Sequence, residues 1–169
     1  MNIAKTLENY YEVECFDSEG NLKWADTFKN LITTAGASDS LNAHLKGGAQ
    51  TTTWYVGLTG GTPTFAIADT MASHGGWTDD VTYSNATRPT LTLGALTGTS
   101  TVTCDNSASK AVFNINGTAT MGGAFVTSVS TKGGTTGILY GGGAFSGGNR
   151  SVINGDTLNV TITTTCAAA

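Results

Sequence analysis

Residues 157–163 read Thr-Leu-Asn-Val-Thr-Ile-Thr, and this stretch decides the fold class. Leu158, Val160 and Ile162 alternate with short polar residues without a break. Side chains of a β-strand point alternately to the two faces of its sheet, so strict alternation predicts a strand with one buried face. The polar positions hold Thr and Asn rather than Lys and Glu, and Thr packs well on a pleated surface. This strand is expected to close a β-sheet.

Similar short runs recur when the chain is followed back from this strand. They are separated by turn signals at intervals of roughly 8–12 residues. The strongest signals are Asn116-Gly117 and Asn154-Gly155, because an Asn-Gly pair is typical of a two-residue hairpin turn. The predicted strands are 90–96, 99–104, 111–115, 124–130 and 138–145, and the last pair is preceded by glycine pairs at 122–123 and 133–134. Regular short strands predict an all-β sandwich or barrel.

The N-terminal part of the chain predicts a β-hairpin. Its first strand covers residues 10–17, with Tyr11, Val13 and Cys15 on one face. A Ser-Glu-Gly-Asn turn cluster then leads into a second strand over 22–32. The alternation places the carboxylates of the first strand on the opposite, solvated face.

One helix is expected, over Ala37–Lys46. Ser38 or Asp39 can cap its N-terminus, and the following Gly47-Gly48 can stop it. Residues 1–9 show no period and are expected to form an arm. The domain division that results is an arm and hairpin over 1–36 and a β-sandwich over 37–169, joined in one compact unit.

Composition and charge exclude several classes of partner. Charged residues make up 12% of the 169 residues, against about 25% in an average domain, and the net charge is −4. The eight Lys and Arg residues are dispersed, so no basic footprint for nucleic acid is present. No apolar run approaches the roughly 18 residues of a membrane span, and the first 15 residues lack the apolar region of a signal peptide. We therefore expect no nucleic acid and no membrane as partners, and synthesis in the host cytoplasm.

The three cysteines, Cys15, Cys104 and Cys166, follow neither a disulfide framework nor a metal-ligand spacing. Small buried hydrophobic side chains are the expected role, and a single disulfide stays open as an alternative.

The stretch from Trp54 to Arg88 holds most of the side chains that can do more than pack. A buried strand over 54–58 opens it, and residues 59–88 then follow no period. A loop of this length in a compact domain is usually either functional or disordered, and its large apolar residues favour an ordered loop. The candidates for structural or interface roles are Trp54, Tyr55, Asp69, His74, Trp77, Tyr83 and Arg88.

This stretch does not match a catalytic or metal-binding motif. The carboxylates around His74 follow no metal-ligand spacing, and Asp69 is better explained as a brace that accepts hydrogen bonds from loop backbone N–H groups. Ser73 and His74 are neighbours in sequence and lack the Gly-x-Ser-x-Gly elbow of a hydrolase. We therefore expect no catalytic residue, no metal and no cofactor, and we do not expect an enzyme.

Several short motifs stand together along residues 22–165. They are Trp54-Tyr55-Val56-Gly57-Leu58, Asp69-Thr70, Ser73-His74, Gly76-Trp77, Tyr83, Arg88, Gly123-Ala124-Phe125 and Gly155-Asp156-Thr157-Leu158-Asn159-Val160-Thr161. As a set they resemble a family of small structural proteins of tailed bacteriophages, the capsid cement or decoration proteins. The resemblance implies a jelly-roll-like antiparallel β-sandwich that binds the outer surface of an assembled capsid and carries no catalytic residues.

The partners that this resemblance implies are the major capsid protein and further copies of the chain, as a dimer or trimer, on the outer surface of the virion. The physical pattern agrees, because strands with so little charge are weakly protected against association, and we expect another subunit to cover part of them. The alternative is a phage tail-fibre or receptor-binding module. A carbohydrate-binding form of it would expose Trp54 or Trp77 for stacking on a sugar, although packing is the commoner role of such residues.

Overall fold

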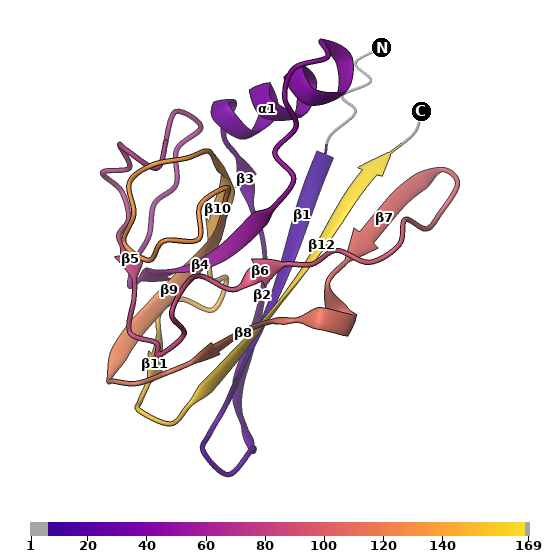
Figure 1. Ribbon diagram of the computed structural model, residues 1–169. Helices are drawn as coiled ribbons and strands as arrows, with labels where there is room; N and C mark the ends of the chain where they lie inside the picture. Colours follow the sequence, from indigo (N-terminus) through magenta and orange to yellow (C-terminus); the bar gives the residue numbers. More distant parts are fainter. Residues whose placement is uncertain (1–6, 168–169) are drawn as a thin grey trace.

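The computed structural model describes residues 7–167, and these form two antiparallel β-sheets that face each other (Figure 1). The fold class expected from the sequence, an all-β antiparallel sandwich with an N-terminal hairpin and a helix, is confirmed. The helix is α1 (Thr34–Leu45), and a single 3-10 turn, η1, covers Ser107–Ser109.

The five-stranded sheet, called sheet A below, has the order β2-β1-β12-β7, with β8 also paired to β12. Its strands are β1 (Leu7–Phe16), β2 (Leu22–Lys29), β7 (Thr101–Asp105), β8 (Ala111–Asn114) and β12 (Thr157–Ala167). Because β1 pairs with both β2 and β12, the N-terminal hairpin is an integral part of this sheet. Residues 7–9 of the expected arm belong to β1, and residues 1–6 lie outside the described part.

The seven-stranded sheet, called sheet B, has the order β3-β10-β9-β4-β5, with β11 paired to β9 and β6 paired to β4. Its strands are β3 (Leu31–Ile32), β4 (Trp54–Gly60), β5 (Asp79–Asp80), β6 (Thr90–Leu91), β9 (Ala119–Thr127), β10 (Leu139–Ala144) and β11 (Arg150–Val152).

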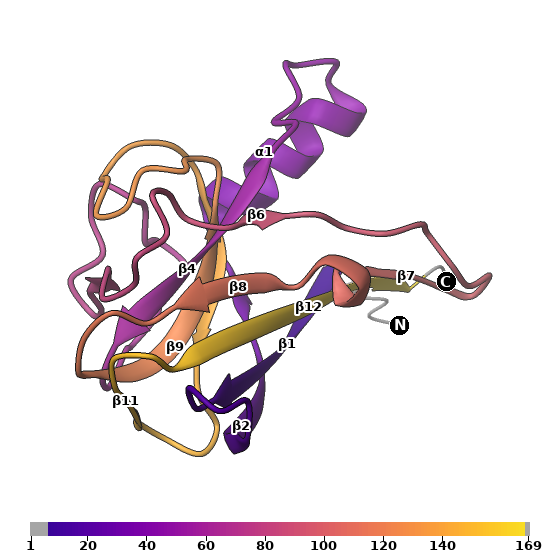
Figure 2. The ribbon, with the colours of Figure 1, turned by 60° about the horizontal axis from the view of Figure 1, so that its bottom comes forward.

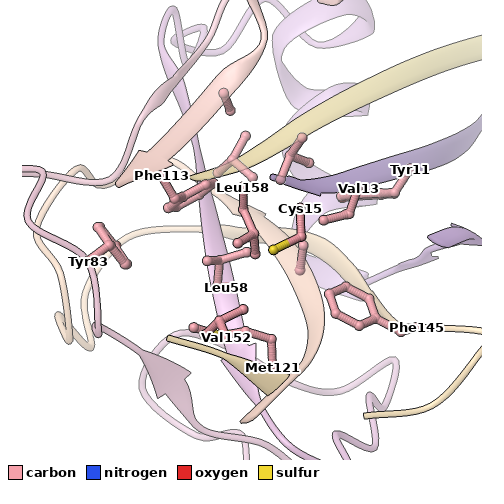
Figure 3. Packing of buried hydrophobic residues seen from close by; sticks show 14 of the residues in the cluster. Tyr11, Val13, Cys15, Leu58, Tyr83, Phe113, Met121, Phe145, Val152 and Leu158 are labelled. Atoms are coloured by element: carbon pink, nitrogen blue, oxygen red, sulfur yellow. The ribbon is translucent and has the colours of Figure 1, made fainter. Parts of the chain in front are cut away.

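The main hydrophobic core lies between the two sheets (Figure 3). Sheet A contributes the alternating residues that the sequence predicted, including Val13, Cys15 and Leu158, and sheet B contributes Leu58 and Met121. Burial, and next the charge of nearby Asp156, raise the pKa of the Cys15 thiol to about 12, so the thiol stays neutral. All three cysteines are free, but only Cys15 is buried as the sequence predicted, because Cys104 is half-buried and Cys166 is exposed.

Two predicted hairpins are wrong, because the chain changes sheets where a hairpin was expected. Asn116-Gly117 joins β8 of sheet A to β9 of sheet B, and neither residue has the positive φ that a type I′ turn requires. Asn154-Gly155 likewise joins β11 to β12, and only Gly155 has a positive φ, of 94°. An Asn-Gly pair lets the chain turn sharply, but burial of the flanking apolar residues decides which strand pairs next.

The predicted strand over 22–32 is also divided between the sheets. Strand β2 ends at Lys29, and after Asn30 the short strand β3 pairs with β10 in sheet B. The Asn30 backbone N–H donates to the Asn9 carbonyl at 3.1 Å, which fixes the corner. A continuous apolar pattern cannot show such a corner, because it does not reveal which strand each half pairs with.

The helix begins three residues before the predicted start. Thr33, not Ser38 or Asp39, is the N-cap, and its hydroxyl accepts a hydrogen bond from the Gly36 N–H at 3.1 Å. Gly36 packs so closely on β10 that an added Cβ would stand 2.3 Å from the Tyr140 carbonyl oxygen. The stop signal was correct, since the helix ends at Leu45.

Two long strands, β12 and β9, are each paired along one edge with two shorter strands in succession. Strands β7 and β8 run beside β12 with η1 between them, and the Asn106 side chain fills the gap: its amide donates to the Val160 carbonyl at 3.1 Å and its oxygen accepts from the Ile162 N–H at 2.6 Å. Strands β10 and β11 run beside β9 in the same way. Strand β9 also passes straight through Gly122-Gly123, which the sequence placed before a strand over 124–130.

The segment predicted as a strand over 90–96 pairs with β4 only at residues 90–91. Figure 2 shows the chain after β6 running from sheet B across to β7. There the Gly94 N–H donates to the Asp105 carbonyl at 2.7 Å, and Thr97 forms a bridge with Thr103. This segment therefore covers the outer edge of β7 instead of extending sheet B.

Candidate functional site

The outer face of sheet B is covered by the chain itself. Phe125 of β9 points away from the main core and packs with Trp77 at a ring-centroid distance of 4.8 Å, and Trp77 stacks on Phe65 at 5.0 Å. Met71 and Leu139 complete this second hydrophobic cluster. The loop that follows β4 is therefore ordered, as the sequence predicted, because its large side chains are fixed to the sheet.

Glycines on β4 and β10 make room for these rings. An added Cβ on Gly57 would stand 2.2 Å from the Phe125 ring, and one on Gly142 would stand 2.3 Å from the Phe65 ring. The aromatic side chains thus lie over strand positions that have no side chain of their own.

Asp69 braces the loop in the way the sequence indicated. One of its carboxylate oxygens accepts hydrogen bonds from the Ala66 N–H and from the Trp77 indole N–H, each at 3.0 Å. His74 stacks on the Trp77 ring at 3.8 Å, and its Nδ1 lies 3.0 Å from the Trp77 carbonyl oxygen. Asp69 and His74 therefore both contact Trp77, and these contacts hold the loop in place.

Arg88 is completely buried and joins two loops. Its guanidinium pairs with Asp79 at 2.7 Å, donates to the Val129 carbonyl at 2.8 Å and lies over the Phe125 ring at 5.2 Å. The same Asp79 oxygen accepts the Gly133 N–H at 2.7 Å. A buried ion pair needs such additional hydrogen bonds, because both charges have lost their water.

Tyr83 is also buried, with its ring packed edge-on against Phe113 at 5.0 Å. Lys132 lies over the Tyr83 ring at 4.5 Å and donates to the Tyr83 carbonyl at 2.7 Å. Burial, and next the negative charge of Asp79, raise the pKa of the Tyr83 phenol, which therefore stays protonated. Together with Asp69, His74, Trp77 and Arg88, Tyr83 has a structural role.

The remaining two candidates lie on β4 and point to opposite sides of sheet B. Tyr55 is half-buried on the outer face, whereas Trp54 is half-buried and packs against the main core. Trp54 lines a cavity with Asn9 of β1 and Thr164 of β12, at the end of the sandwich where β1 begins and β12 ends. Trp54 meets Tyr140 in an edge-to-face contact with ring centroids 5.2 Å apart.

This cavity of about 160 Å³, called the end pocket below, lies at this end, between α1 and the two sheets. Trp54, Tyr140 and Leu91 form much of its apolar wall, and Asn9 of β1 and Asp39 of α1 contribute polar groups. Burial raises the pKa of the Tyr140 phenol, although a hydrogen bond with Ser40 opposes this, and the phenol stays protonated. The structure therefore contains a pocket that the sequence could not reveal.

The outer face of sheet A differs from that of sheet B, because no helix or strand in the described part of the chain packs on it. Its residues are those that alternate with the core positions, and all of those named here except Thr161 are exposed or half-buried. They include Thr101, Thr103, Thr157, Thr161, Thr163, Thr165, Thr27, Asn159 and Asn114. We call this set, with Tyr10, Glu12, Glu14 and Lys29, the threonine face.

The few charges at the threonine face are mostly paired. Lys110 lies 2.6 Å from Glu14, and Lys29 lies 3.4 Å from Glu8 and over the Tyr10 ring at 4.7 Å. An open depression of about 570 Å³ crosses the face beside Glu12, Thr27 and Thr163. It is also lined by Thr161, which is only 8% exposed and whose hydroxyl has no hydrogen-bond partner among residues 7–167.

Comparisons with known proteins do not place the chain in a family. No protein-family model matches it, and no curated protein sequence matches it significantly. Within residues 7–167, no group of three His, Cys, Asp or Glu side chains converges in a way that could hold a metal ion. None of the helical segments described is both long and apolar enough to cross a membrane.

Proposed function

We propose that the chain is a virion structural protein that binds the outer surface of an assembled bacteriophage capsid and stabilises it. The observation that supports this most directly is the threonine face. It is a broad sheet surface on which most of the few charges are paired, and it has a depression that holds the unpartnered hydroxyl of Thr161. A hydroxyl buried without a partner costs about 1–3 kcal/mol, which a partner supplying a donor or acceptor would recover.

The contact expected from such a face is large and only weakly charged. Protein interfaces are distinguished by few charged residues at their centre. Here the Thr and Asn side chains of β12 lie beside Glu12 and Glu14 of β1, and Glu14 is paired with Lys110. Many copies on one lattice would bind with avidity, and binding only the assembled capsid would stabilise it by mass action. The proposed partners are the major capsid protein and further copies of the chain, as a dimer or trimer.

The test is cosedimentation of the purified protein with undecorated capsids, followed by heating. We expect saturable binding and a higher temperature of capsid disruption. The double variant Thr103→Arg/Thr163→Arg should lose binding, because two unpaired charges would be placed in the contact. The matched control, Thr135→Arg/Thr136→Arg, changes exposed residues in the loop before β10 and should bind normally. Equal binding by both variants would remove the threonine face from the proposal.

The second candidate is a tail-fibre or receptor-binding module. Trp77 is buried, which removes one of the two aromatic residues that such a module could expose to a sugar. The position of Trp54 in the wall of the end pocket is the observation that favours this candidate. Absence of capsid binding, with the protein found at the tail of labelled virions, would favour it.

A further inference from the structure

The end pocket contains an acceptor that the fold leaves unused. The Asn9 side chain lines the cavity and is 3% exposed, yet its Oδ1 has no hydrogen-bond partner among the described residues. Buried polar atoms of folded proteins almost always have a partner, and one without a partner requires an explanation. A ligand with a hydrogen-bond donor at this position would provide it.

The other polar side chains of the pocket are mostly uncharged. Asp39 is the single carboxylate that the described residues contribute to the lining, and it already accepts the Thr51 hydroxyl at 3.1 Å. Among residues 7–167, neither Lys nor Arg lines the cavity, whereas Ser, Thr, Gln and Asn side chains and His44 do. Such groups both donate and accept, so they match a neutral ligand with several hydroxyl groups better than an ion.

The apolar side of the pocket is aromatic. Trp54 and Tyr140 meet edge to face, with Val126 and Leu93 beside them. The indole N–H groups of Trp24 and Trp77 donate to Ser151 and Asp69, but that of Trp54 has no partner in residues 7–167. An aromatic residue with one apolar and one polar part suits a ligand that has a C–H face and hydroxyl groups.

We propose that this pocket binds a single pyranose unit of a carbohydrate. The ring would lie against Trp54 and Tyr140, and one of its hydroxyl groups would donate to Asn9 Oδ1. The cavity, about 160 Å³, is small enough to select one sugar unit rather than a chain lying along the surface. This proposal does not rest on capsid binding, because the pocket and the threonine face use different residues.

The three indole groups provide a direct experiment on the full chain. The ¹⁵N-labelled protein is titrated separately with glucose, galactose, mannose and N-acetylglucosamine, and the indole N–H signals are followed by NMR. We expect at least one sugar to move the Trp54 signal, with half-saturation at about 1–10 mM, since a ligand of about twelve heavy atoms gains little affinity. The Trp24 and Trp77 signals should stay in place, and Trp54→Phe identifies the Trp54 signal by removing it.

Asn9→Ala tests the assigned hydrogen bond. It should weaken sugar binding about 5–10-fold, as expected for one hydrogen bond. The fold should tolerate it, because the lost oxygen has no partner in the protein; unchanged Trp24 and Trp77 signals would verify this. Asn114→Ala, on the exposed face of β8, is the matched control and should bind the sugar normally.

Two results would overturn the proposal. One is a Trp54 signal that no sugar of the panel moves at concentrations far above the millimolar range. The other is a Trp54 signal that moves with butylamine but with none of the sugars, because the pocket would then recognise a cation through Asp39.

Discussion

The outer faces of the two sheets show two ways of finishing a β-sandwich. Sheet B is covered by its own loops, with Phe125, Phe65 and Trp77 packed over strand glycines. Sheet A carries short polar side chains and has no helix or strand of the described chain upon it. The comparison shows that a low content of charge does not by itself mark a surface for contact. The residues on each face decide whether the chain covers the sheet or leaves it free.

The largest expected effect comes from removing the ring at the centre of the covered face. Phe125→Ala should lower the free energy of unfolding by about 3–5 kcal/mol, because it empties a fully buried site beneath Trp77 and Arg88. Urea denaturation would measure it. Thr163→Ala on the threonine face is the control. Substitutions on a protein surface usually change the free energy of unfolding by about 0.5 kcal/mol or less. A loss of less than about 1 kcal/mol for Phe125→Ala would therefore show that the loop does not act as a second core.

A smaller effect should follow from filling the space that the covered face needs. Gly57→Ala would place a Cβ 2.2 Å from the Phe125 ring, and overpacking of this kind costs about 1–3 kcal/mol. Gly75→Ala is the matched control, since an added Cβ there meets no atom within 4 Å. Thermal unfolding of both variants gives the comparison. Equal stability of the two would mean that Phe125 can move aside, and that the glycine is not required beneath the ring.

The two sheets are held in place by a carboxylate whose effect depends on pH. Asp26 of β2 is buried and accepts hydrogen bonds from Ser146, Gly147 and Arg150, which follow β10 in the chain. Burial alone would raise the pKa of Asp26, but the hydrogen bonds from Ser146, Gly147 and Arg150 outweigh it and lower the pKa. The stability that the Asp26 carboxylate contributes is fully present above the pKa of this group in the unfolded chain, about 3.9. It is lost as the pH falls through the lowered pKa of Asp26 in the folded protein.

Asp26→Asn should therefore cost about 1.5–3 kcal/mol at neutral pH, the amount expected for hydrogen bonds to a charged group. The difference from the unchanged protein should shrink below about pH 4, where the carboxyl of the unchanged protein becomes protonated. Thermal unfolding measured across this pH range tests both statements. A constant difference at every pH would contradict the role assigned to the carboxylate charge.

The smallest expected effect concerns the free face. Thr163→Ala and Thr165→Ala should each change the free energy of unfolding by no more than about 0.5 kcal/mol, because these side chains are half-exposed on a sheet that other residues stabilise. On the proposed function, the double variant should nevertheless bind capsids more weakly in the cosedimentation assay. Losses of stability as large as those on sheet B would remove the distinction between the two faces.

Sequence patterns predicted the strands better than their partners. Alternation identified the core positions of β1 and β12, because the period of a strand depends only on which face is buried. It did not show the corner at Asn30 or the sheet changes at Asn116 and Asn154, since the same local residues suit a hairpin or a crossing. The choice between them depends on contacts far away in the sequence.

The same limit applies to the candidate sites. The bracing role of Asp69 was predictable from turn chemistry, because its partners lie within eight residues. The end pocket was not, since Asn9, Asp39, Trp54, Tyr140 and Thr164 come from five separate elements or loops. Nor did the sequence show that Arg88 is buried. Its charge is paired with Asp79, and its guanidinium donates to the Val129 carbonyl, more than 40 positions away in the chain.

The pairing of β1 with β12 has a consequence for the order in which the protein can fold. Leu7 lies opposite Cys166 and Phe16 lies opposite Thr157, so β1, the first strand of the described chain to be synthesised, has to wait for β12 before the centre of sheet A can form. Contacts between such distant residues slow folding, because a long loop must close before they form. Until then β1 can pair only with β2, and its other edge stays open to aggregation. The centre of sheet A is thus expected to form only after β12 has been synthesised.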